Sequence, residues 1–363
     1  MKKGIVMWFC IILLFLGGCA FKDIDKRLFV LGMGVDKSEN DEEPFHISLK
    51  VSMPSSENGG RPEEQHVVLE ETGESITDAI NKIRTKVDQE IDFGHAKVLL
   101  FGSGILEGKV DYLVNWFLRK HTIQQIAFTA LVEEKAVDIL SISSDTETQP
   151  SYGLVIAFEQ TGTESPYITR KYLFQFRREH MDEGVDPLLP VVHLEENEHI
   201  IETAGILNKK GELIKLEKEE TKIYNLLKQN IDELDIKVRP GDNFLTMRAN
   251  IVQAQFELLT DQDPLTIKVP LTIHGSVEES FHTVSKEEQK EAEKQIEEKV
   301  TKQVEGLLKK FQEENVDPLA LGIKYRSMQW NDWKSIERWK ELYPDVKFQV
   351  ETDVKIKSIG AVK

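Results

Sequence analysis

Residues 285–311 read SKEEQKEAEKQIEEKVTKQVEGLLKKF, a long run with helical periodicity. Ser285 and Glu288 have the spacing of a capping box, in which each side chain binds the backbone N–H of the other residue. Apolar side chains then recur every three or four residues, so they fall on one face of a helix. This stripe ends before Pro318 and consists of Ala292, Ile296, Val300, Val304, Leu307, Leu308 and Phe311.

Two alternating segments flank this helix and predict the sheet that its stripe covers. Residues 266–276 and 346–356 both alternate apolar and polar side chains, as half-buried strands do. Pro270 lies on the polar side of the first segment, which suits an edge strand or a bulge. A shorter helix after Asp332 is expected to cap the layer with Trp333, Ile336 and Trp339. We therefore expect an α+β domain that packs one long helix on an antiparallel sheet.

The preceding residues predict mixed α/β layers. Residues 28–140 alternate short apolar runs with amphipathic ones, including a helix from Ser75 that ends near Gly94. Residues 201–207 and 213–216 are separated by a glycine turn and predict a β-hairpin. The apolar run 152–158 fits a helix as well as a strand.

The chain is thus expected to be a multi-domain protein of mixed α/β and α+β class. We assign residues 28–195 to an N-terminal α/β region and residues 196–363 to a C-terminal α+β domain. The polar stretch 141–151 leaves open a division of the first region into two subdomains.

The first residues have the order of an export signal. Lys2 and Lys3 precede an apolar run that is too short to span a bilayer, and Leu16-Gly17-Gly18-Cys19 follows it. This tetrapeptide resembles a lipobox, which implies a lipid on the Cys19 thiol and cleavage before that residue. We expect a signal peptide over 1–18 and a lipid-anchored tether over 19–27. The alternative is an ordinary signal peptide with an incidental cysteine.

Composition narrows the possible functions further. The chain has 2 cysteines, and Cys10 lies in the apolar run, so a processed chain has no internal disulfide and no thiolate zinc cluster. The net charge of −17 would repel a nucleic-acid backbone and an anionic membrane surface alike. We therefore expect no nucleic-acid partner, and attachment to a membrane through lipid rather than charge.

Several short motifs, taken in order, resemble one known family. They include residues 31–36 (LGMGVD), 93–100 (FGHAKVLL), 117–119 (FLR) and 204–207 (AGIL). Gln312, Asp317-Pro318 and Gly322 follow the long helix, ahead of Trp333-Lys334 and Trp339. The combination is similar to the Ger(x)C lipoproteins, the C subunits of spore germinant receptors. Among these residues we single out Gly94, His95, Lys97, Gln312, Asp317 and Pro318 as family-motif positions of unknown role.

The resemblance implies a lipid-anchored subunit on the outer face of the spore inner membrane. Its implied partners are the A and B membrane subunits of a nutrient receptor that triggers germination. The family has no known catalytic residues, so we expect no enzyme activity and no cofactor. The family usually has a tryptophan soon after the cysteine and Lys-Leu-Gln before Asp-Pro, where this chain has Phe21 and Phe311-Gln312. These departures leave open a divergent paralogue with a different receptor complex.

Three segments could suggest a nucleotide site, a metal site or a ligand site, but each has a simpler structural interpretation. The glycine-rich run 101–109 lacks the Walker spacing and the hydroxyl after Lys109, so we interpret it as a turn and expect no nucleotide. The run His193–His199 is interpreted as a solvated acidic linker rather than a divalent metal site. His95 is expected to bond the backbone at the start of a strand, and Trp330, Trp333 and Trp339 are expected to be core.

The sequence supports three classes of function to different degrees. An envelope enzyme finds no support, since no G-x-S-x-G motif occurs. A solute-capturing lipoprotein that feeds a transporter is the alternative, and a deep pocket between domains would favour it. We favour a non-catalytic subunit that scaffolds or couples the membrane subunits of the receptor.

The lipobox generates the first prediction. Cys19→Ala should abolish stable membrane retention, because the only thiol left after processing carries the lipid. A labelled fatty acid should appear on the wild-type chain and be absent from the variant. Equal labelling of both chains would rule out the lipid assignment.

Overall fold

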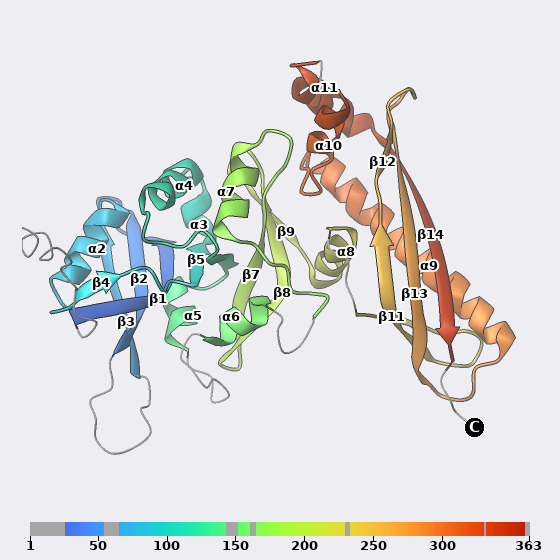
Figure 1. Cartoon of the computed structure of the whole chain (residues 1–363), viewed down its shortest axis with the longest axis horizontal. Helices are drawn as coiled ribbons and strands as arrows, with labels where there is room; N and C mark the ends of the chain where they lie inside the picture. The colour runs from blue at the N-terminus through green and yellow to red at the C-terminus, as the bar shows by residue number, and fades with distance from the viewer. Residues whose placement is uncertain are drawn as a thin grey trace, which may run out of the picture.

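The computed structural model describes residues 26–53, 65–142, 152–159, 165–228, 233–329 and 332–359. The expected lipid site, Cys19, and Trp330 lie outside these ranges. The described residues form two domains side by side along the long axis of the molecule (Figure 1). The fold is of mixed α/β and α+β class, as the sequence predicts.

The N-terminal domain contains a nine-stranded sheet in the order β3-β2-β1-β5-β6-β7-β8-β9, with β4 paired to β1. Strands β1, β5, β6 and β7 are parallel neighbours, and β4 also runs parallel to β1. Strands β2, β3, β8 and β9 pair in antiparallel fashion. The strands are β1 Arg27–Lys37, β2 Phe45–Met53, β3 Gln65–Gly73, β4 Glu90–Asp92, β5 Val98–Gly102, β6 Phe128–Val132, β7 Leu188–Glu195, β8 Glu198–Leu207 and β9 Leu213–Leu216.

Helices cover both faces of this sheet, because parallel strands need crossover connections. One buried cluster joins one sheet face to α2, α3, α4 and α7, and a second joins the other face to α5 and α6. The undecided run 152–158 is therefore a helix. The helices are α2 Ile76–Arg84, α3 Ser103–Leu106, α4 Val110–Arg119, α5 Ala136–Ser141, α6 Tyr152–Glu159 and α7 Leu173–Met181.

The C-terminal domain is built on a five-stranded sheet, β10-β11-β13-β12, with β14 on the free side of β13. The long helix is confirmed, including the capping box of Ser285 with Glu288 and the burial of the whole predicted stripe. The elements are α8 Lys218–Lys228, β10 Leu234–Val238, β11 Leu245–Ala254, β12 Glu257–Leu259, β13 Thr266–Ser280, α9 Lys286–Glu313, α10 Leu321–Met328, α11 Ser335–Leu342, the 3-10 turn η2 Tyr343–Asp345 and β14 Lys347–Ser358.

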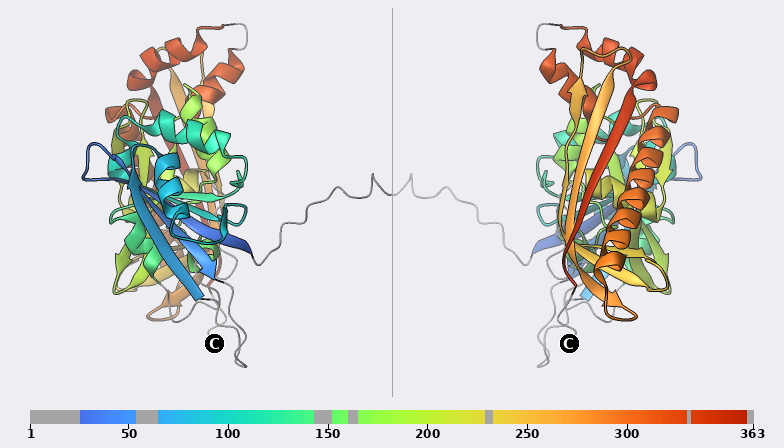
Figure 2. Two further views of the ribbon diagram at one scale, coloured as in Figure 1. Left: turned by 90° about the vertical axis from the view of Figure 1, so that its left-hand side faces the viewer. Right: turned by 90° about the vertical axis from the view of Figure 1, so that its right-hand side faces the viewer.

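The expectation of a purely antiparallel sheet is wrong at one strand. β14 runs parallel to β13, with Thr266 opposite Lys347 and Gly275 opposite Ile356. Parallel neighbours cannot be joined by a tight turn, and α9 is the long connection that returns the chain to the start of the sheet. The right-hand view of Figure 2 shows α9 alongside β13 and β14.

Pro270 lies in the interior of this sheet rather than at an edge. β13 has neighbours on both sides there, but β11 ends at Ala254 and β12 begins at Glu257. The backbone N–H of Gln255 donates to the Pro270 carbonyl at 3.2 Å in this gap. The missing N–H of proline is tolerated because the neighbouring strand is interrupted at that position.

The predicted hairpin of residues 201–216 is confirmed, but it belongs to the nine-stranded sheet of the N-terminal domain. β8 pairs with β7 across the expected boundary between residues 195 and 196, so that boundary falls inside a β-hairpin. Glu196 and Asn197 have φ angles of 48° and 71°, the left-handed conformation that tight hairpin turns require. The interpretation of His193–His199 as a linker is therefore wrong.

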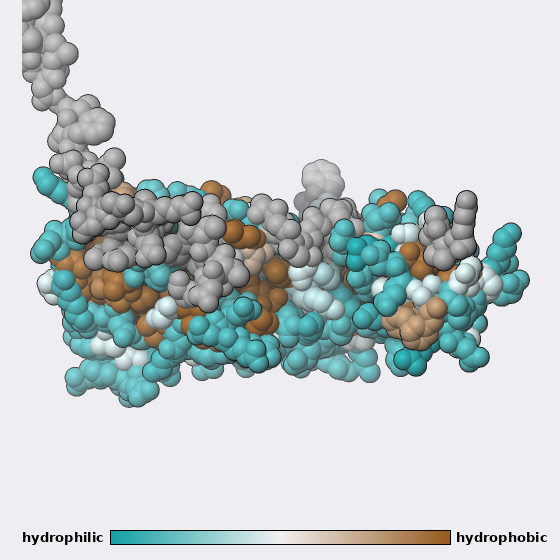
Figure 3. Space-filling view, turned by 90° about the horizontal axis from the view of Figure 1, so that it is seen from below, coloured by the Kyte–Doolittle hydropathy of each residue, from teal (hydrophilic) through white to brown (hydrophobic). Residues whose placement is uncertain are grey.

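One buried cluster crosses from the N-terminal to the C-terminal domain. It joins Leu188, Ala204, Ile206 and Leu216 of the first sheet to α8, α9 and the second sheet. Among the described residues, no helix combines the length and apolar character needed to cross a membrane. The face in Figure 3 is mostly hydrophilic over the C-terminal domain and has larger apolar areas over the N-terminal domain.

The packing of α9 generates the second prediction. Ile296→Asp or Val304→Asp should lower the free energy of unfolding by about 3 kcal/mol or more, because each would bury an unpaired carboxylate. Both side chains are fully buried, whereas the Glu298 side chain is 68% exposed. Glu298→Ala is the matched control and should change stability little. Thermal melts that do not separate the core variants from this control would contradict the packing.

Candidate functional site

Asp317, a motif residue, lies where the two domains meet. Its carboxylate is buried and accepts hydrogen bonds from the backbone N–H groups of Leu321 at 3.0 Å and Gly322 at 2.7 Å. These groups open α10 and have no partner inside the helix. Pro318 follows directly in the turn that leads to the helix. The Asp-Pro motif therefore caps α10.

Asp317 also binds the loop that precedes β7 in the N-terminal domain. Its N–H donates to the Asp186 carboxylate at 2.8 Å, and its carbonyl accepts from the Asp186 N–H at 3.1 Å. The two aspartates thus exchange hydrogen bonds, and these bonds join the two domains. Asp186 is not among the motif positions that the sequence singles out. The Asp186-Pro187 dipeptide, with the same order as Asp317-Pro318, was the available signal.

Two glycines allow the backbones to approach at this junction. A Cβ on Gly184 would lie 3.0 Å from the Ile323 nitrogen, and one on Gly322 would lie 2.7 Å from atoms of the Trp339 ring. Trp339 is buried between Tyr325 and Tyr343, with ring centroids 5.6 and 5.1 Å away. The motif positions Asp317, Gly322 and Trp339 therefore form one structural contact.

Burial controls the ionisation of this junction. It raises the pKa of Asp317 to about 6, against the opposing effect of the Gly322 and Leu321 hydrogen bonds. Burial likewise raises the pKa of Asp186. Burial has the opposite effect on a cation of the junction, because it lowers the pKa of Lys209. The Lys209 ammonium donates to the carbonyls of Glu179, His180 and Asp182 at 2.6–3.0 Å.

A cavity of about 260 Å³ adjoins the aspartate pair and is lined in part by Asp186, Lys209, Trp339, Lys340 and Tyr343. Several of its polar groups bind protein atoms. Lys340 pairs with Glu183, and the Tyr343 hydroxyl donates to the Val316 carbonyl at 2.9 Å. These contacts help to hold the two domains together.

Gln312 organises the end of the same region. Its side-chain amide donates to the carbonyls of Tyr343 at 3.0 Å, Pro344 at 3.4 Å and Val346 at 2.9 Å. These residues form the turn that leads into β14. Gln312 therefore couples the end of α9 to the start of the parallel strand.

The motif of Gly94, His95 and Lys97 lies elsewhere, at the amino ends of β5 and β6. The Gly94 N–H donates to Asp92 at 2.8 Å, and the Gly94 carbonyl accepts from Gln124 at 2.7 Å. The backbone of Lys97 bonds both Leu31 and Phe128, which belong to the strands on either side. The two motif groups are therefore not brought together into one site.

Within the described residues, the His95 side chain makes no hydrogen bond to the backbone, contrary to the expectation. Its exposed ring lies edge-on against Phe29, with centroids 4.6 Å apart. The expectation that the tryptophans are core holds for Trp339 but is wrong for Trp333, whose exposed fraction is 84%. Trp333 precedes α11 and so misses the helical face that buries Trp339.

Asp36, at the end of the residue 31–36 motif, is a further structural carboxylate. It accepts a hydrogen bond from the Ala136 N–H at 2.9 Å, at the start of α5. Burial raises its pKa to about 6. No group of three or more potential metal ligands occurs in the described part of the chain, and within the His193–His199 run His199 bonds the Ile139 carbonyl at 2.9 Å.

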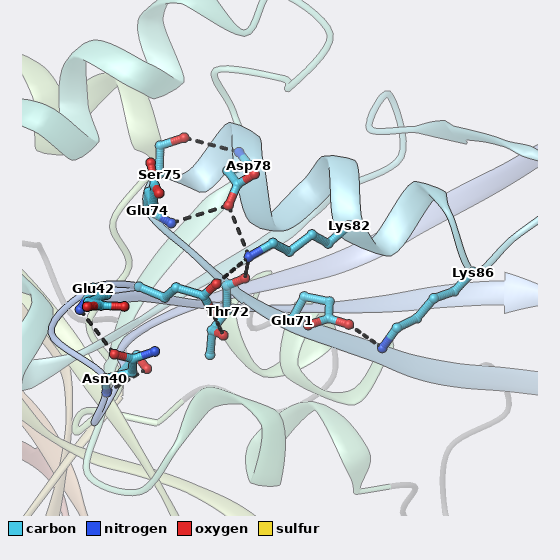
Figure 4. Close-up of polar contacts among 11 residues, drawn as sticks. Asn40, Glu42, Glu71, Thr72, Glu74, Ser75, Asp78, Lys82 and Lys86 are labelled. Atoms are coloured by element: carbon cyan, nitrogen blue, oxygen red, sulfur yellow. Dashed lines mark hydrogen bonds and ion pairs between the residues drawn. The ribbon is translucent and has the colours of Figure 1, made fainter.

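A polar cluster clamps α2 onto β3 and the loop between β1 and β2 (Figure 4). The Lys82 ammonium contacts Glu43 at 2.6 Å, Asp78 at 3.2 Å and the Thr72 carbonyl at 3.1 Å. Lys86 pairs with Glu71 at 2.5 Å. These ion pairs fix the position of α2, and with it that of its last residue, Arg84.

Two families of known proteins match the chain in succession, and the change from one to the other falls in the β7–β8 hairpin. Residues 21–194 match the spore germination protein N-terminal domain family, and residues 202–360 match the spore germination B3/GerAC-like C-terminal family. The chain is 21% identical to the spore germination protein GerQC of Bacillus cereus, over the full length of both. It shares the fold of the crystal structure of the GerBC protein, with a TM-score of 0.61 and 16% identity over 90% of this chain and 98% of that one.

The aspartate pair generates the third prediction. A carboxyl group whose pKa is higher in the folded chain holds its proton more tightly there, so stability falls as the pH rises from about 4 to about 6. For Asp317 the loss across this window is on the order of 3 kcal/mol. Asp317→Asn, which cannot titrate, should lack this part of the pH dependence of the melting temperature.

The control is Asp242→Asn, which removes an exposed carboxylate. Its melting temperature should follow the wild-type pH profile. If Asp317→Asn also followed that profile, the raised pKa of Asp317 would be contradicted.

Proposed function

Because the chain belongs to the spore germination B3/GerAC-like family, we propose that it is a non-catalytic subunit of a nutrient germinant receptor. It scaffolds or couples the A and B membrane subunits of that receptor. A lipid on Cys19 holds it at the outer face of the spore inner membrane. The observation that carries this proposal is the match of both family domains, in order, over nearly the whole chain.

The use of the motif residues supports a structural role. Asp317, Gln312 and Gly322 bind or pack against neighbouring backbone and fix how the domains meet. A subunit that transmits or maintains an arrangement of partners needs such a rigid junction. Catalysis, by contrast, needs ionisable groups that face a substrate.

The alternative, solute capture, receives some support from the position of the junction cavity between the domains. Its volume of about 260 Å³ lies below the roughly 300–1,000 Å³ typical of ligand pockets. The Lys209 ammonium is occupied by three carbonyls, so it is not free to hold a ligand carboxylate. We therefore favour the scaffold.

The fourth prediction separates the two functions. Affinity purification of the chain from detergent-treated spore membranes should recover the A and B subunits, and Cys19→Ala should reduce their recovery strongly. Calorimetry of the purified chain against amino acids and sugars should show no specific heat of binding. A micromolar nutrient complex that is lost in Trp339→Ala but kept in Trp333→Ala would favour solute capture instead.

A further inference from the structure

One end of the N-terminal domain gathers cations and exposed apolar side chains. We define the amino-end surface as His95, Lys97, Arg119, Lys120, Ile126 and Phe174. The segments that carry them are joined by hydrogen bonds from Gln124 to the Gly94 carbonyl at 2.7 Å, from Phe128 to the Lys97 carbonyl at 2.8 Å and from Phe174 to the Gln125 carbonyl at 3.0 Å.

The cations of this surface lack carboxylate partners. Among the described residues, the side chains of Lys97 and Arg119 have no hydrogen bond or ion pair. The Lys120 ammonium lies 5.0 Å from the centre of the Phe93 ring. Burial, and then the charge of nearby Arg84, lower its pKa, and no carboxylate counters them. The nearby carboxylate of Asp92 is already paired with Arg27 at 2.9 Å.

Helix ends explain only part of this arrangement. Arg84 and Arg119 end α2 and α4, where a cation offsets the partial negative charge of the helix terminus. The same end also exposes Ile126 by 57% and Phe174 by 40%. Tyr112 and Trp116 line an open groove of about 520 Å³ that leads along α4 to Arg119 and Lys120. Cations beside exposed apolar and aromatic groups are typical of a protein surface at a bilayer interface.

The tether brings this end to the membrane. β1 begins at Arg27, and the pairing of Arg27 with Glu90 and the contact of Phe29 with His95 place its first residues beside this surface. The seven residue steps from Cys19 to Lys26 reach at most about 25 Å in any conformation. The rest of the chain is strongly acidic and is repelled by an anionic bilayer, which favours the cationic end facing it.

We infer that the amino-end surface contacts the anionic phospholipid headgroups of the membrane that holds the Cys19 lipid, an inference that rests on the anchor proposed above. The cations bind the headgroup phosphates, while Ile126 and Phe174 enter the interface between headgroups and acyl chains. The motif residues His95 and Lys97 thereby acquire a role in orienting the receptor subunit on the bilayer.

The test uses the lipidated full-length chain in vesicles of phosphatidylcholine, with or without phosphatidylglycerol. Flotation first checks that the chain is bound through its lipid. Hydrogen exchange of residues 93–97 and 119–128 should then be slower in the phosphatidylglycerol vesicles. High salt should remove the difference, because it screens the headgroup charge.

The doubly substituted variant Arg119→Glu with Lys120→Glu should float equally well and lose the slowing. Lys347→Glu with Lys357→Glu, an equal charge change on exposed positions of β14, should retain it. Equal exchange in both kinds of vesicle, with flotation intact, would overturn this inference and leave the proposed function standing. Failure of the wild-type chain to float would overturn the anchor and this inference together.

Discussion

The carboxylate of Asp317 is the contact on which the arrangement of the two domains depends. It satisfies the first N–H groups of α10, while its own backbone exchanges hydrogen bonds with Asp186 in front of β7. A buried donor or acceptor without a partner costs about 1–3 kcal/mol, so neither side of the junction can move without losing several bonds. Gly184 and Gly322 let the backbones come close enough for these bonds to form.

The same junction continues into an apolar core. The cluster that includes Leu188 and Ile206 of the first sheet also includes the α9 stripe and Trp339. Polar bonds fix the relative orientation of the domains, and the shared core makes their separation costly. Such a two-domain body suits a subunit that acts by holding partners, since a partner bound to one domain is held in a set orientation to the other.

Charge is distributed unevenly over this body. Most of the acidic groups are on solvated surfaces, whereas Arg84, Arg119 and Lys120 gather beside the first residues of β1. The clamp of Lys82 on Glu43 and Asp78 sets the position of α2 and hence of Arg84. The polar residues of the N-terminal domain thus shape the end at which β1 begins.

The sequence alone determined the features that depend on near neighbours along the chain. The α9 stripe, its capping box and the hairpin of residues 201–216 follow from periodicity and turn chemistry, and the ordered motifs identified the family. Only the tertiary structure decided the parallel direction of β14, the pairing of β8 with β7, the exposure of Trp333 and the partnership of Asp317 with Asp186. Alternation of side chains shows that a strand is half-buried but not which strand lies beside it, because pairing depends on contacts between residues far apart in the chain.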